Sequence, residues 1–156
     1  MLKRMSAVSK ALFVSCLLIL FSASVVEAGG RSLSGSWSTR QAVPYLQQLG
    51  GEEPDLFSTE LVWTLTEDED GLISGFSDFV AFDAEGAEIS SGQLRLVGTR
   101  FGRSFAIAQG DLSESGQTGM TFQCERRRVN RIVCLGTSTG GLSPLGLRLL
   151  LTRVDE

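Results

Sequence analysis

This chain contains no histidine. It contains only two lysines, and both lie within the first ten residues. The lack of histidine removes the commonest general base and the commonest metal ligand. With only three cysteines in the sequence, a zinc site would also be short of ligands. No serine or threonine has a recognisable activating partner. The sequence therefore predicts no metal or other cofactor and no catalytic residue, and it favours a protein that is not an enzyme.

Long apolar runs are also scarce. The longest, Ala11–Phe21, follows three basic residues and is shorter than the ~20 residues of a membrane-spanning helix. This pattern is typical of a secretory signal peptide, with cleavage expected after Ala28 and, as second choice, after Ser24. A retained membrane anchor is the alternative. We expect residues 1–28 to be removed and residues 29–156 to form one domain, secreted or periplasmic, with no stable transmembrane span.

Positive charge is limited in the expected mature chain. It has eleven arginines against seventeen acidic residues, a net charge near −6. Nucleic acids and anionic membranes bind proteins with excess cationic charge, so we expect no nucleic-acid partner. Two cysteines, Cys124 and Cys134, remain after the signal. In an oxidising compartment they are expected to form a disulfide.

No long segment has the 3.6-residue period of a helix, whereas short strand-like runs recur between turn residues. Most connections are short enough for hairpins, which favours up-and-down antiparallel order. The sequence predicts an all-β fold, an eight-stranded antiparallel up-and-down barrel. The eight expected strands are 33–41, 59–67, 72–82, 88–98, 101–109, 118–126, 129–137 and 145–154.

The stretch between the first two expected strands, residues 42–58, is longer than the other connections. Pro44 could begin a short helical turn and Gly50 could end it. Apolar residues here could form the underside of a lid over the barrel mouth, or the stretch could be an ordinary surface loop. The residues that would face the barrel are Tyr45, Leu46, Leu49 and Phe57.

Alternation along each strand predicts which side chains face the interior. In the last strand four leucines share one face with Arg153, and we assign such apolar faces to the interior. The same rule places Asp78 inside, where it could pair with Arg95 or Arg103 or serve as a polar contact for a ligand. The residues predicted to bind a ligand are Trp63, Phe76, Asp78, Phe105, Leu147 and Leu149.

The segment Gly35-Ser36-Trp37 together with the late Arg153 resembles the structural signature of the lipocalin and calycin barrels, which include the avidin-like barrels. Residues 70–75 look like the early hairpin of the avidin-like group. The resemblance implies a closed barrel in which the arginine lies over the indole and plugs one end. The tryptophan-rich pocket of biotin binders is missing, as are the Thr-Asp-Tyr motif and the C-terminal helix of classical lipocalins. An unrelated β-sandwich is the alternative fold.

Four arginines cluster on the hairpin that the two cysteines would clamp: Arg126, Arg127, Arg128 and Arg131. Such a group could bind a carboxylate, sulfate or phosphate on a glycan, a lipid or an acidic partner. The alternative is a solvated turn whose charges pair with nearby acids.

The preferred function is an exported, non-enzymatic barrel that binds a small hydrophobic or amphipathic molecule. The first alternative is a filled barrel that acts through its surface as a protein inhibitor or envelope interaction module. A barrel-type isomerase or cyclase, which relies on cavity shape and a few polar groups, ranks third.

Overall fold

The computed structural model describes residues 31–48, 53–110, 119–138 and 145–154, and every regular element in these ranges is a strand. The strands are β1 (Gly35–Ser38), β2 (Val43–Gln47), β3 (Asp55–Glu67), β4 (Leu72–Phe82), β5 (Glu88–Phe101), β6 (Ser104–Gly110), β7 (Met120–Arg128), β8 (Arg131–Ser138) and β9 (Leu145–Arg153).

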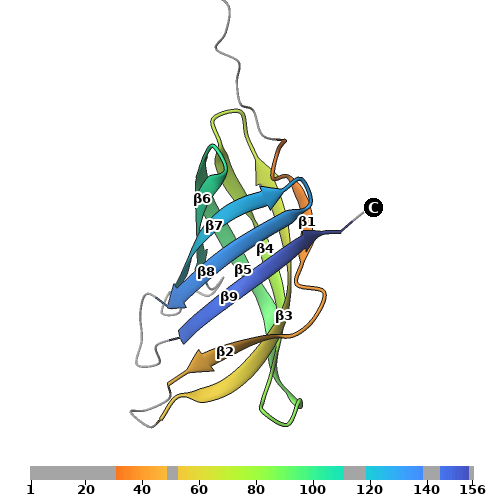
Figure 1. Ribbon diagram of the computed structural model, residues 1–156, viewed down its shortest axis with the longest axis vertical. Coiled ribbons are helices and arrows are strands. Elements are labelled where there is room, and N and C mark those ends of the chain that lie inside the picture. The colour runs from red at the N-terminus through yellow and green to blue at the C-terminus, as the bar shows by residue number, and fades with distance from the viewer. Residues whose placement is uncertain (1–30, 49–52, 111–118, 139–144, 155–156) are drawn as a thin grey trace, which may run out of the picture.

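The strands form one closed antiparallel sheet (Figure 1). From β3 to β9 each strand pairs with the next one in the chain. Both β1 and β2 lie between β3 and β9, so together they occupy one position of the barrel. The result is an eight-stranded up-and-down barrel, as predicted, with its first strand divided in two. Closure leaves no long sheet edge open for pairing with another chain.

The division between β1 and β2 is a local insertion. Trp37 pairs with Trp63, whereas Tyr45 pairs with Phe57. The register of β2 against β3 is therefore shifted by two residues from that of β1 against β3. The pairing with β9 shifts by the same amount. The extra residues lie at positions 39–42, where Arg40 has a φ of 60°. The strand predicted at 33–41 is therefore shorter and continues as β2 after the insertion.

The helical turn predicted to begin at Pro44 is wrong, because residues 43–47 are strand β2. Pairing on both sides, with β3 and with β9, overrides the local tendency of a proline to start a helical turn. Tyr45 is largely buried and stacks on Phe57 with ring centroids 5.6 Å apart, while Leu46 points outward. Leu49 and Gly50 lie outside the described residues.

The barrel interior forms a continuous apolar core. Trp63 is fully buried in this core and meets Phe122 edge to face, with ring centroids 5.1 Å apart. The fully buried large side chains come from seven strands and from the segment before β1: Leu33, Trp37, Trp63, Leu96, Ile107, Phe122, Ile132, Leu149 and Leu151. Burying each such side chain contributes about 1.5–3 kcal/mol, so the filled core is the main source of stability.

The inward face of β4 is the opposite of the predicted one. Ile73 and Ser77 are buried, whereas Phe76 and Asp78 are exposed. Both faces of this strand carry apolar residues, so alternation alone could not choose between them. The pairing decides, because Ser77 lies opposite Trp63, and directly opposed residues of antiparallel strands share a face.

Cys124 and Cys134 lie opposite each other on β7 and β8 and form a disulfide, with Cα atoms 4.1 Å apart. Both are buried in the barrel core. No helix long and apolar enough to cross a membrane is found in the part of the chain that the structure describes.

Candidate binding sites in the barrel

The interior positions change from apolar to charged at one end of the barrel. Each charged residue lies two or four positions beyond a core residue on the same strand, and therefore on the same face. Thus Glu67 follows Leu65 on β3, and Arg153 follows Leu151 on β9. The four charged interior residues at this end are Glu67, Arg100, Arg126 and Arg153. We call this the arginine end.

Trp37 closes the core at the arginine end. The Arg153 guanidinium lies over its ring, with Cζ 5.2 Å from the centroid, and the Arg126 guanidinium lies 5.9 Å away. The indole Nε1–H donates to the Leu33 carbonyl at 2.8 Å. Gly35 has a φ of 121°, and a Cβ there would come within 2.9 Å of Arg153 Nη2. The backbone conformation therefore favours glycine at this position, and the missing Cβ leaves room for the Arg153 guanidinium.

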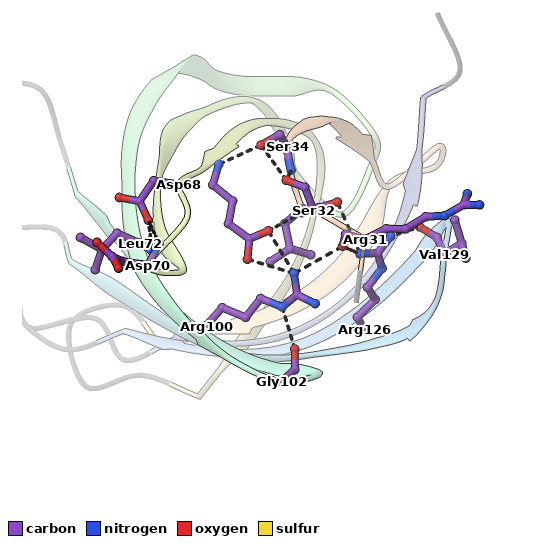
Figure 2. A network of polar contacts seen from close by, with 12 residues as sticks. Arg31, Ser32, Ser34, Asp68, Asp70, Leu72, Arg100, Gly102, Arg126 and Val129 are labelled. Carbon is purple, nitrogen blue, oxygen red and sulfur yellow. Dashed lines mark hydrogen bonds and ion pairs between the residues drawn. The ribbon is translucent and has the colours of Figure 1, made fainter. Parts of the chain in front are cut away.

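Glu67 and Arg100 form a buried ion pair, with Nη1 2.9 Å from Oε1. Glu67 also accepts a hydrogen bond from the Leu33 N–H at 2.6 Å. Arg100 donates further to the carbonyls of Gly102 and Arg31. Figure 2 shows Arg100 and Arg126 directed toward the segment that carries Arg31 and Ser32. The chain segment before β1 is thus fastened across the arginine end by guanidinium groups.

Arg126 differs from its expected place on an exposed hairpin tip, because only 6% of its surface is accessible. It points into the barrel end and donates to four backbone carbonyls, those of Arg31, Ser32, Arg128 and Val129. Burial lowers the pKa of the Arg126 guanidinium, and so do the positive charges of its arginine neighbours. Alternation with Phe122 and Cys124 could have indicated this inward direction.

The other predicted hairpin arginines remain outside the core. Arg127 pairs with Glu125 at 3.0 Å on the exposed surface. Arg128 and Arg131 are exposed and lie opposite each other at the hairpin turn. The structure therefore divides the predicted cluster between the core end and the surface.

The half of the barrel away from the arginine end contains a cavity of about 140 Å³. Its wall is mainly apolar and comes from seven strands, β2 to β7 and β9. The lining residues are Tyr45, Thr59, Leu61, Ser77, Phe79, Ala81, Leu94, Gln109, Met120, Phe122, Leu145 and Leu147.

Two polar atoms in the cavity wall have no hydrogen-bond partner among the described residues, Ser77 Oγ and Gln109 Oε1. Trp63 Nε1, opposite Ser77 in the β3–β4 pairing, is a third buried polar atom of this kind. A buried polar group without a partner costs about 1–3 kcal/mol. The cavity wall therefore offers hydrogen-bonding groups that the barrel itself does not use.

Tyr45 forms part of the cavity wall and is the only tyrosine of the chain. Burial raises the pKa of its phenol above the ordinary value of 10.0, because the phenolate is poorly solvated there. Its titration is therefore an optical reporter of the cavity that no other tyrosine obscures.

The residues predicted to bind a ligand are not all in the cavity. Leu147 lines it, whereas Trp63, Phe105 and Leu149 belong to the filled core. Phe76 is 41% exposed on the outer face of β4, which corrects the prediction that it faces the interior.

Asp78 is likewise outside, and it pairs with neither Arg95 nor Arg103. It accepts a hydrogen bond of 2.7 Å from Gln93 Nε2, directly opposite on β5. The buried ion pair that we expected at Asp78 is formed by Glu67 and Arg100 instead.

Sequence reasoning missed Ser77 and Gln109 because the assigned face of β4 was inverted and the Gln109 side chain gives no distinctive signal. Of the described residues, no three histidine, cysteine or acidic side chains gather where a metal ion could bind. No protein-family model matches the chain, and no curated protein matches its sequence.

Proposed function

We propose that this protein is an exported, non-enzymatic, lipocalin-like barrel that binds a small amphipathic molecule in the 140 Å³ cavity. The observation that carries the proposal is the coincidence of an apolar wall with buried polar atoms that lack partners, Ser77 Oγ and Gln109 Oε1. A ligand with an apolar body and one hydrogen-bonding group would satisfy both features.

The size of the cavity limits the ligand. An engineered protein cavity of about 150 Å³ holds one benzene molecule. The part of the ligand inside the barrel should therefore be near the size of one aromatic ring. Export is supported by the paired cysteines, which are compatible with an oxidising compartment.

The test compares phenol with toluene. The two have nearly the same shape, but toluene has a methyl group where phenol has a hydroxyl group. Binding of both compounds is followed by ¹H–¹⁵N NMR, and binding of toluene also by the alkaline absorbance titration of Tyr45, because phenol itself ionises and absorbs in the same range. We expect phenol to bind about two- to tenfold more tightly than toluene, the range for one additional hydrogen bond. Toluene in the cavity should shift the Tyr45 titration to higher pH, because it displaces solvent near the phenol.

Ser77→Ala and Gln109→Met should reduce the preference for phenol. The matched control is Ser74→Ala, on the exposed face of the same strand, which should leave the preference unchanged. If neither compound produces saturable shifts at the cavity residues, the container function is wrong, and a filled barrel that acts through its surface becomes the preferred interpretation.

A further inference from the structure

A second pocket lies at the arginine end, outside the Trp37 plug. Its volume is about 250 Å³, and six of its seven lining residues are arginines. They come from three separate segments: the stretch before β1, the β5–β6 hairpin and the β7–β8 hairpin. The lining residues are Arg31, Arg100, Arg103, Arg126, Arg127, Arg128 and Val129.

Few negative charges oppose these arginines. Glu67 pairs with Arg100 beneath the pocket, and Glu125 pairs with Arg127 at its side, but neither carboxylate is part of the wall. Asp68 belongs to the neighbouring turn, where its carboxylate accepts hydrogen bonds from the N–H groups of Asp70 and Leu72. Figure 2 shows Asp68 and Asp70 standing apart from the arginine network. The pocket is thus strongly cationic in a chain of net charge −4.

The arginines of the pocket have different roles. Arg100 and Arg126 are held by carbonyls and by Glu67, so they set the shape and the electrostatic potential of the site. No hydrogen bond or ion pair within the described part of the chain engages the guanidinium groups of Arg103 and Arg128. These two groups are therefore available as donors to a bound anion.

We propose that this pocket binds a phosphate group. Guanidinium groups donate pairs of hydrogen bonds to phosphate oxygens, and donors on separate hairpins suit a tetrahedral group better than a planar carboxylate. The volume corresponds to about eight water molecules, which is enough for a phosphate monoester or a pyrophosphate. This site shares no lining residue with the apolar cavity, so the proposal does not depend on the function proposed above.

The phosphate could belong to a soluble compound or to a lipid head group. Phe101, 91% exposed, and Val129, 50% exposed, lie on the two hairpins that carry most of the pocket arginines. Apolar side chains beside a cationic pocket would contact the acyl region if the phosphate were that of a membrane lipid. The experiment therefore includes both sources.

The first arm titrates the protein with inorganic pyrophosphate by calorimetry, with sulfate at equal ionic strength as the comparison. We expect saturable binding, tighter for pyrophosphate. The double variant Arg103→Gln/Arg128→Gln should weaken it by about a hundredfold or more, because it removes two charged donors, and the loss of each costs about tenfold or more. The controls are Arg131→Gln on the same hairpin, Arg148→Gln on the outer face of β9, and the two combined, which removes the same two charges outside the pocket lining. All three should have little effect.

The second arm measures sedimentation with phosphatidylcholine vesicles, with and without phosphatidylglycerol. Binding that requires phosphatidylglycerol and is lost in Phe101→Ser as well as in the double variant assigns the phosphate to a lipid. Pyrophosphate binding without vesicle binding assigns it to a soluble compound. If pyrophosphate and vesicles both fail to bind, if sulfate binds equally well, or if the control variants weaken binding as much as the double variant, the proposal is overturned.

Discussion

At the residue scale, Trp37 determines how the barrel is closed at the arginine end. Its indole lies near two guanidinium groups, from Arg126 and Arg153, and is hydrogen-bonded to Leu33. A cation over an aromatic face contributes about 0.5–2 kcal/mol, more when water is excluded. Trp37 is fully buried, so the contact with Arg153 should lie in the upper part of that range.

A double-mutant cycle tests this contact. Trp37→Leu and Arg153→Met should each lower the free energy of unfolding, and the coupling between them should be about 1 kcal/mol or more. Urea unfolding followed by circular dichroism provides the measurement. Arg148→Met, on the exposed face of the same strand, should show no coupling to Trp37. A double variant as stable as the unaltered protein would contradict the plug.

At the element scale, the pairing of β3 with β4 determines which groups line the cavity. It turns Ser77 inward beside Trp63 and brings Gly75 opposite Leu65. A Cβ on Gly75 would overlap the Thr64 carbonyl, which belongs to the backbone and cannot move aside easily. The approach of the two strands thus depends on a glycine that sequence periodicity does not single out.

Gly75→Ala should therefore destabilise the barrel by about 2 kcal/mol or more, through overpacking against the backbone. Gly146→Ala on β9 is the control, since a Cβ there meets nothing within 4 Å. The control should change stability by less than about 0.5 kcal/mol. The measurement is the urea midpoint of each variant, and similar midpoints for the two would show that the β3–β4 approach is not tight.

At the scale of the whole molecule, the two ends of the barrel have different character. The half next to the arginine end is filled by the large core side chains, and beyond them lies the cationic pocket. The other half contains the apolar cavity. Closure depends on pairing between the first and last strands, so the core is complete only when the whole chain has folded.

Unfolding should therefore be a single cooperative transition. Tryptophan fluorescence reports on Trp37 and Trp63, both fully buried, and far-ultraviolet circular dichroism reports on the strands. Their urea transitions should coincide, as expected for a domain with one core. If the fluorescence changed at distinctly lower urea than the dichroism, part of the sheet would be stable without the core, and closure would not be what holds the barrel together.

The sequence by itself determined the all-β class, the approximate positions of most strands, and the cysteine pair that forms a disulfide. It also paired Gly35 and Trp37 with Arg153, which the structure places in contact. The strands are recognised from local alternation and turn residues. The disulfide was predicted because an exported chain with two cysteines and no histidine has little other use for them. The inward face of β9 was predicted from the same alternation, because four of the five leucines in this strand lie on one face.

Only the tertiary structure decided which face of β4 points inward and the pairing of Glu67 with Arg100. The two faces of β4 are similarly apolar, so the register with β3, rather than the residues of β4 themselves, determines which face points inward. The charged cluster collects side chains from four strands that are far apart in the chain, and barrel closure brings them together. Both candidate binding sites depend on that closure, which is why the sequence indicated only the hairpin arginines of one site and Leu147 of the other.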